Sequence, residues 1–107
     1  MIKVTVVPKS REKLYGLLVK KEIALRNKNQ GTLHRSGSKK KREAKWVHTS
    51  YKGWIRFQQS LGGMTVALVQ AKNRGDEWQL LTSFIGFLHR HFSDSISTIS
   101  ISLDTDD

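Results

Sequence analysis

The residues with the clearest chemical character stand in one short segment, residues 31–46, whose sequence is GTLHRSGSKKKREAKW. Clustered ammonium and guanidinium groups repel one another, and a polyphosphate relieves that repulsion while releasing its own condensed counterions. Only Glu43 opposes them in this segment. The segment therefore predicts contact with nucleic acid or another polyanion, and it leaves DNA, RNA and sequence preference open. The six cations are Arg35, Lys39, Lys40, Lys41, Arg42 and Lys45.

Aromatic and cationic residues continue to alternate beyond this segment. Bases stack on aromatic faces, and neighbouring cations hold the phosphates beside them. Alternate residues of an extended strand share a face, so Trp54 and Arg56 are predicted on one surface, with Ile55 and Phe57 in the core. The additional residues predicted to contact nucleic acid are Trp46, Lys52, Trp54 and Arg56.

Two other functions fit the same segment. His34 and His48 bracket the lysines, and RNA cleavage by internal transesterification needs an acid, a base and a cation for the developing charge. A small basic ribonuclease or toxin is therefore one alternative. The second alternative is a protein-interaction adaptor that docks an acidic partner on the same cations. We expect binding rather than catalysis, because no spacing fixes the histidines near each other.

Metal and cofactor chemistry has little support in the sequence. The chain contains no cysteine. His89 and His91 are two residues apart on a predicted helix, so they point in different directions and cannot share one metal ion. Glycine-rich phosphate loops are also absent, and we expect neither a metal nor a cofactor.

Charge is distributed very unevenly along the 107 residues, which carry a net charge of +10. Residues 1–57 hold 16 Lys or Arg and three acids, whereas residues 58–107 hold three cations and six acids. A field of this kind concerns partners and association rates more than the fold. The first residues alternate instead of forming the apolar run of a signal peptide or membrane span. We expect no membrane role and a location in the cytoplasm or, in a nucleated cell, the nucleus.

The spacing of apolar residues predicts the strands and helices that position these residues. Residues 2–7 alternate as a strand, and Leu14, Leu17, Leu18 and Leu25 share a helical stripe that favours a helix through residue 27. An alternating pattern over 17–25 also permits a strand there. Residues 28–44 show no period and are predicted to be a mobile basic loop. Residues 46–71 form a hairpin of two extended segments, 46–57 and 64–70.

The second half of the chain contains the strongest helical pattern, over residues 77–93, with Asp76 as the predicted N-cap. Its apolar flank, Leu80, Phe84 and Phe87, is either core or the surface of a homodimer. Ile96, Ile99, Ile101 and Leu103 follow, the last three alternating with Ser as a predicted final strand, and an acidic tail, 104–107, ends the sequence. The whole chain is predicted to be one α+β domain, a two-layer sandwich with two helices on one face of a four-stranded, mostly antiparallel sheet in a ferredoxin-like arrangement.

Overall fold

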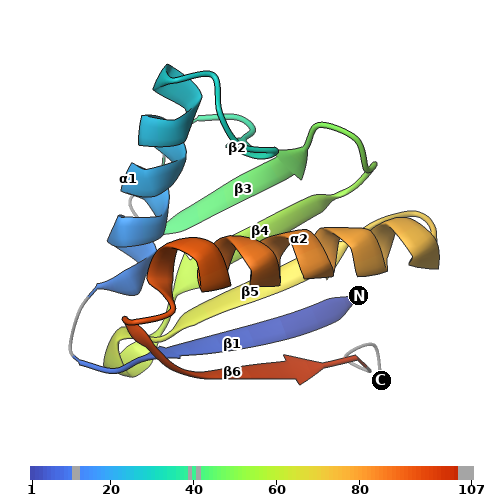
Figure 1. Cartoon of the computed structure of the whole chain (residues 1–107). Helices are drawn as coiled ribbons and strands as arrows, with labels where there is room; N and C mark the ends of the chain where they lie inside the picture. The colour runs from blue at the N-terminus through green and yellow to red at the C-terminus, as the bar shows by residue number, and fades with distance from the viewer. Residues whose placement is uncertain (11–12, 39, 41, 104–107) are drawn as a thin grey trace.

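The structure is a computed structural model that describes residues 1–10, 13–38, 40 and 42–103. Within these residues the chain forms two α-helices, six β-strands and one 3₁₀ turn (Figure 1). The predicted acidic tail, 104–107, lies outside the described residues. The elements are β1 (Ile2–Pro8), α1 (Leu14–Asn27), β2 (Leu33–Arg35), β3 (Glu43–His48), β4 (Trp54–Gln59), η1 (Leu61–Gly63), β5 (Thr65–Gln70), α2 (Arg74–Phe92) and β6 (Ile96–Ser102).

All six strands belong to one antiparallel sheet with the spatial order β2-β3-β4-β5-β1-β6. The first strand of the chain lies inside the sheet, where Val4 pairs with Ala67 of β5 and with Ile101 of β6. The prediction of a four-stranded, ferredoxin-like sheet is therefore wrong. The chain is an α+β protein in which two helices accompany a six-stranded sheet.

The two additional strands have different physical origins. The chain reverses between β3 and β4 at Gly53, so that what the sequence suggests is one bent strand becomes a hairpin. Gly53 has a φ of 134°, a backbone conformation that residues with a Cβ rarely adopt. β2 is defined by its pairing with β3, because Leu33 lies opposite His48 and Arg35 lies opposite Trp46. The predicted loop over 28–44 therefore contains β2 and the start of β3.

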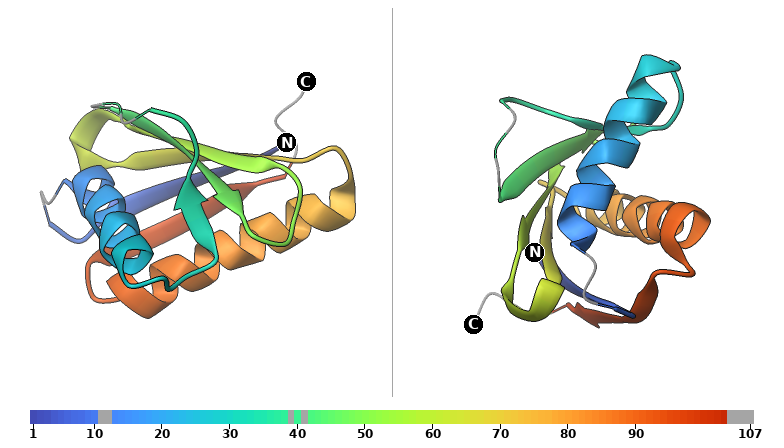
Figure 2. Two further views of the ribbon diagram at one scale, coloured as in Figure 1. Left: turned by 90° about the horizontal axis from the view of Figure 1, so that it is seen from above. Right: turned by 90° about the vertical axis from the view of Figure 1, so that its left-hand side faces the viewer.

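Both helices cover the same face of the sheet, as the end-on view shows (Figure 2). The segment 17–25, which the sequence leaves open between helix and strand, is part of α1. Leu14 and Leu18 of its predicted stripe are fully buried. The predicted inward residues Ile55 and Phe57 are also fully buried, which confirms the facing of β4.

An aromatic cluster joins the sheet to both helices. The Trp46 ring lies edge-on against Phe57 at 4.7 Å between centroids and against Phe87 of α2 at 5.0 Å. Tyr15 of α1 contacts Phe57 at 5.5 Å, and Phe84 of α2 lies 6.2 Å from the same ring. Such pairs stabilise a core by about 0.5–1.5 kcal/mol each beyond the area that they bury. Residues from β3, β4, α1 and α2 are thereby held in one core.

Helix α2 begins earlier than predicted and buries the flank whose role the sequence leaves open. Asn73, not Asp76, is the N-cap, because its Oδ1 accepts a hydrogen bond from the Asp76 backbone N–H at 2.7 Å. Leu80, Phe84 and Phe87 are almost completely buried in the core. This flank is therefore occupied by the protein's own packing and does not offer a free surface for a homodimer.

A β-bulge adjusts the last strand to the core. Ile99 and Ile101 lie opposite Val6 and Val4, on the helix-covered face of β1. Ile96 stands three residues before Ile99, so strict alternation would turn it to the other face. The register shifts between Val7 and Pro8, and Ile96 lies opposite the buried Pro8 as a result. The bulge thus keeps all three isoleucines of β6 on one face.

The reversal at Gly53 generates a stability prediction. A Cβ built on Gly53 collides with the carbonyl oxygen of Gln70 and crowds Leu80. We expect Gly53→Ala to lower the free energy of unfolding by about 3 kcal/mol or more, because a strained φ and a steric clash add. Urea unfolding followed by tryptophan fluorescence measures this loss.

Gly37→Ala is the matched control. Gly37 also has a positive φ, of 85°, but a Cβ there meets no atom within 4 Å. The control should cost only the left-handed backbone term, about 1–2 kcal/mol. Equal losses in the two variants would contradict the proposed role of the close contact at Gly53.

Candidate nucleic-acid interface

The face of the sheet opposite the helices is lined by side chains that alternate with the core residues. Cross-strand pairing joins them into two rows, because residues directly opposite each other point to the same face. Each row begins on β3 and ends on β6. One row is Lys45, Arg56, Leu68, Lys3 and Ser102, and the other is Glu43, Gln58, Val66, Thr5 and Ser100.

From β4 to β6 these rows line a broad groove of about 670 Å³, whereas Lys45 and Glu43 of β3 lie outside it. Val66 and Leu68 of β5 form an apolar floor in its middle, and both are only partly buried. Arg56 lies on one side of the floor and Lys3 on the other, with hydroxyl groups along β6. The groove therefore combines cations, hydrogen-bonding groups and a partly exposed apolar surface.

Trp54 extends this face beyond the groove. The Lys45 ammonium lies 5.0 Å from the centroid of the Trp54 ring, within the range of a cation–π interaction. Trp54 is partly exposed, in contrast to its neighbour Ile55. The predicted grouping of Trp54 with Arg56 on the surface away from the core is therefore confirmed. Because the Lys45 ammonium lies over the Trp54 ring, a base could stack only on the part of the ring that Lys45 leaves uncovered.

The cations of the open face have no acidic partner among the residues that the structure describes. Lys3, Lys45 and Arg56 form no ion pair there, and Lys3 and Arg56 are exposed. Glu43, the acid on the same face, is bound to Lys40, with 3.1 Å between Oε1 and Nζ. The positive charge of the open face is thus not neutralised within the described part of the chain.

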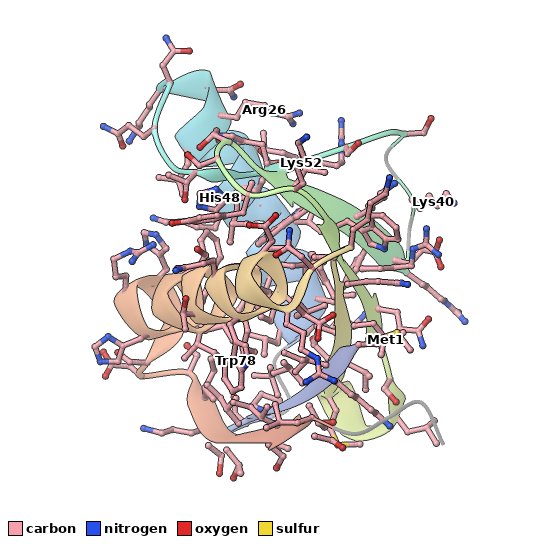
Figure 3. All side chains as sticks on the ribbon, turned by 90° about the vertical axis from the view of Figure 1, so that its right-hand side faces the viewer. Met1, Arg26, Lys40, His48, Lys52 and Trp78 are labelled. Carbon is pink, nitrogen blue, oxygen red and sulfur yellow. The ribbon has the colours of Figure 1, made fainter. Side chains whose placement is uncertain are left out.

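The predicted site residues do not all lie on this face. Trp46 is only 1% exposed and is the centre of the aromatic cluster, so its prediction as a stacking residue is wrong. Arg35 lies opposite Trp46 in the ladder, and its Nε is buried without a hydrogen-bond partner. Lys39 and Lys41 lie outside the described residues. Lys52 is exposed in the turn between β3 and β4 (Figure 3).

The connection from β2 to β3 is attached to helix α1 at one described point. The Tyr15 hydroxyl donates a hydrogen bond to the carbonyl oxygen of Lys40 at 3.1 Å. Burial, assisted by the negative charge of Glu43, raises the pKa of Tyr15, so this hydroxyl keeps its proton at neutral pH. Lys40 and Arg42 are exposed beside this anchor, next to the Glu43 end of the open face.

Three residues that no sequence pattern singled out, Lys3, Gln58 and Ser102, line the groove. Their positions depend on the register between β1, β4, β5 and β6. The paired residues are far apart in the sequence, and Lys3 and Ser102 are separated by 99 residues. The alternation of Ile2, Lys3 and Val4 is the available signal, since it assigns Lys3 to the exposed face of a strand. It does not show which strands lie beside β1.

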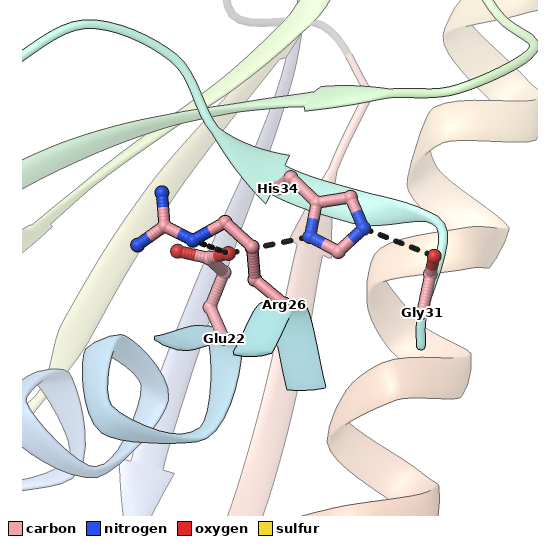
Figure 4. A network of polar contacts seen from close by, with 4 residues as sticks. All are labelled: Glu22, Arg26, Gly31 and His34. Atoms are coloured by element: carbon pink, nitrogen blue, oxygen red, sulfur yellow. Dashed lines mark hydrogen bonds and ion pairs between the residues drawn. The ribbon is translucent and has the colours of Figure 1, made fainter. Parts of the chain in front are cut away.

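A buried acid holds His34 in place (Figure 4). Glu22 is 1% exposed, and its Oε2 lies 3.2 Å from His34 Nδ1 and 3.4 Å from Arg26 Nε. The other ring nitrogen, Nε2, lies 3.0 Å from the carbonyl oxygen of Gly31. Both nitrogens of His34 are therefore occupied by contacts that fix β2 against the end of α1.

His48 is also engaged in local structure. Its Nδ1 accepts a hydrogen bond from the Ser50 backbone N–H at 2.9 Å, and its ring lies 4.6 Å from that of Tyr51. His34 and His48 occupy adjacent, not opposite, positions of the β2–β3 ladder, where His34 pairs with Val47. Three of the four ring nitrogens of His34 and His48 are thus engaged in local contacts.

The described residues contain neither a cluster of metal-ligating side chains nor a membrane-spanning helix. In that part of the chain, no group of three or more His, Asp or Glu side chains is arranged to hold a metal ion. Neither α1 nor α2, the two described helices, is long and apolar enough to cross a bilayer. Comparison with protein-family models, with curated proteins and with solved structures finds no match to this chain.

The environment of His48 predicts a pH effect on stability. Burial lowers the pKa of His48, because it disfavours the charged ring. The unfolded chain then binds the proton at a higher pH than the folded protein does, so stability falls as the pH drops below about 6.5. His48→Asn, which keeps an acceptor near Ser50, should flatten the decrease between about pH 7 and 5 in urea unfolding.

His89→Asn is the control for this experiment, since His89 is exposed at the end of α2. This variant should retain the wild-type loss of stability on acidification. A wild-type slope in the His48→Asn protein would show that burial of His48 does not contribute.

Proposed function

We propose that the protein is a small nucleic-acid-binding module that uses the open face of its sheet. The observation that carries the proposal is the row of Lys45, Arg56, Leu68 and Lys3, which places three cations around an apolar floor. Phosphates meet the cations, and bases meet Val66, Leu68 and the free part of Trp54. This division matches the way single-stranded nucleic acid is bound, with a positive groove along the backbone and stacking on apolar or aromatic side chains.

The cations on this face favour an external anion for a simple electrostatic reason. Adjacent positive side chains whose acidic neighbour, Glu43, is bound to Lys40 raise the free energy of the isolated protein, and a polyphosphate removes that cost while losing its bound counterions. An isolated surface salt bridge would contribute little, about 0–1 kcal/mol. Binding should therefore depend strongly on salt and weakly on sequence.

The size of the face suggests how much nucleic acid it contacts. Adjacent strands lie about 4.8 Å apart, so the row from Lys45 on β3 to Lys3 on β1 extends roughly 14 Å at the level of the backbone. A stacked strand advances about 3.4 Å per nucleotide, which corresponds to about four nucleotides. Oligonucleotides of about this length should be the shortest that bind with full affinity.

The connection between β2 and β3 extends the proposed surface. Lys40 and Arg42 are exposed where this connection meets the Glu43 end of the open face. Lys39, Lys41 and Lys52 add positive charge to the proposed binding surface. Phosphate contacts carry no base information, so replacing Lys39, Lys40 and Lys41 together by Ala should weaken binding to all sequences alike.

A salt titration of the open-face variant tests the proposal. Fluorescence anisotropy with labelled single-stranded RNA, single-stranded DNA and duplex DNA measures the affinity at several salt concentrations. We expect Lys3→Ala, Lys45→Ala and Arg56→Ala together to reduce affinity for single strands at low salt by at least tenfold. The slope of log K against log salt should become shallower by about 2, since each lost phosphate contact removes about 0.7.

The matched control removes three exposed cations from the helix layer, Lys20, Lys28 and Arg90, and so changes the net charge equally. It should retain most of the affinity. Equal losses in both variants would show that net charge alone attracts the polymer and would contradict an open-face site. Absence of binding by the wild-type protein at low salt would remove the proposal, and selective binding of an acidic peptide would favour a protein-docking function instead.

A further inference from the structure

The two edge strands of the sheet, β2 and β6, differ in length and in charge. β2 has three residues and carries His34 and Arg35, features that discourage pairing with another chain. β6 has seven residues, ISTISIS, without charge or proline. In the part of the chain that the structure describes, β6 has a neighbouring strand, β1, on one side only. Its outer side is therefore a template of unpaired backbone groups.

Exposed apolar side chains gather beside this edge. The large hydrophobic residues that are exposed in the described chain are Leu61, Trp78, Ile101 and Leu103. Trp78 is 50% exposed, Ile101 46% and Leu103 54%. Trp78 of α2 and Leu103, which follows β6, line the same surface hollow, and Figure 3 shows Trp78 on the β6 side of α2. Hence Ile101 lies on β6, Leu103 directly follows it, and Trp78 lies close to its C-terminal end.

We propose that the protein forms a homodimer by antiparallel pairing of β6 with β6 of a second copy. A register centred on Ser100 places Ile101 opposite Ile99 of the second copy, on the helix-covered face. Ser100 then lies opposite itself, and Thr98 lies opposite Ser102 on the open face. Over residues 98–102 each isoleucine then meets an isoleucine and each hydroxyl meets a hydroxyl, as cross-strand pairing favours. Trp78 and Leu103 then cover the start of β6 in the second copy.

The distribution of charge favours this partner over other ways of joining two copies. Three of the four cations carried by the strands, Arg35, Lys45 and Arg56, lie on β2, β3 and β4, at the end of the sheet far from β6, whereas the fourth, Lys3, lies on β1. Joining copies at β6 leaves these basic ends at the two outer limits of a twelve-stranded sheet, where their repulsion is weakest. Pairing at β2 would instead bring Arg35 and the lysines of both copies together.

The dimer also bears on the open face, independently of what that face binds. Ser100 and Ser102 line the groove at the β6 margin, so the grooves of two copies would meet across the new strand pair. The association of two copies through β6 does not require nucleic acid.

Light scattering coupled to size exclusion tests the association. The wild-type protein should have twice the mass of the 12.2 kDa chain at micromolar concentration, in buffer free of nucleic acid. Ser100→Lys should shift it to the monomer mass, because two like charges would face each other on the two-fold axis. Gln70→Lys adds the same charge at an exposed position of β5 and should remain dimeric. A wild-type monomer at all concentrations, or a dimeric Ser100→Lys variant, would overturn the proposal.

Cross-linking tests the same interface without relying on a disruptive variant. The natural chain has no cysteine, so a single introduced cysteine reports one contact. Ser100→Cys should form a covalent dimer under mild oxidation, because the two thiols lie within disulfide distance in the proposed register. Thr98→Cys, two residues away on the same face, should cross-link at least tenfold more slowly. Equal rates would contradict the register, and no cross-link in Ser100→Cys would contradict the strand pairing itself.

Discussion

The contact of Trp46 with Phe57 and Phe87 is the interaction on which the rest of the structure depends. Trp46 lies on β3, Phe57 on the neighbouring strand and Phe87 on α2, so one indole joins two strands to a helix. Tyr15 brings α1 to the same group of rings. Because the buried aromatic side chains of β3 and β4, Trp46 and Phe57, face one way, both helices pack on that side of the sheet. No helix of the described residues covers the opposite face.

This one-sided packing divides each central strand between two tasks. On β4, Ile55 and Phe57 are buried, while Trp54 and Arg56 lie on the uncovered face. On β3, Trp46 is buried and its neighbour Lys45 is turned to the same uncovered face as Arg56. The core and the proposed binding surface are therefore encoded in alternate residues of the same short segments. A substitution at either set leaves the other set's facing unchanged, which makes the two roles separable by experiment.

The sequence predicts the elements with strong local patterns. The apolar stripes of α1 and α2 and the alternation in β1, β4 and β6 are visible in the chain, and the facing of Ile55 and Phe57 follows from alternation alone. β2 is not predicted, because its three residues are too few to show a period. The break at Gly53 is not predicted either, because a glycine in the sequence does not reveal its φ. Likewise, Trp46 stands among cations in the sequence, and only the tertiary packing shows that it is core.

The candidate site is predictable to a smaller extent than the fold. Lys45, Trp54 and Arg56 follow from charge, aromaticity and alternation on neighbouring strands. Lys3 joins them only because β1 inserts beside β5, where Lys3 pairs with Leu68 across 65 residues, and local propensity does not encode this pairing. The sequence shows His34 only as a possible acid or base near lysines, whereas in the structure both of its ring nitrogens make contacts with Glu22 and Gly31. Long-range register and hydrogen bonding are thus what the sequence pattern omits.

The position of β1 inside the sheet has a consequence for synthesis of the chain. Strands β2, β3, β4 and β5 pair in sequence order, so each can join its predecessor as it emerges from the ribosome. Ile2–Pro8 emerges first, but its partners are residues 65–69 and 96–102. Distant pairings of this kind are slow to form. We therefore expect β1 to remain unpaired until β5 has been synthesised, a period in which nascent-chain chaperones would recognise it.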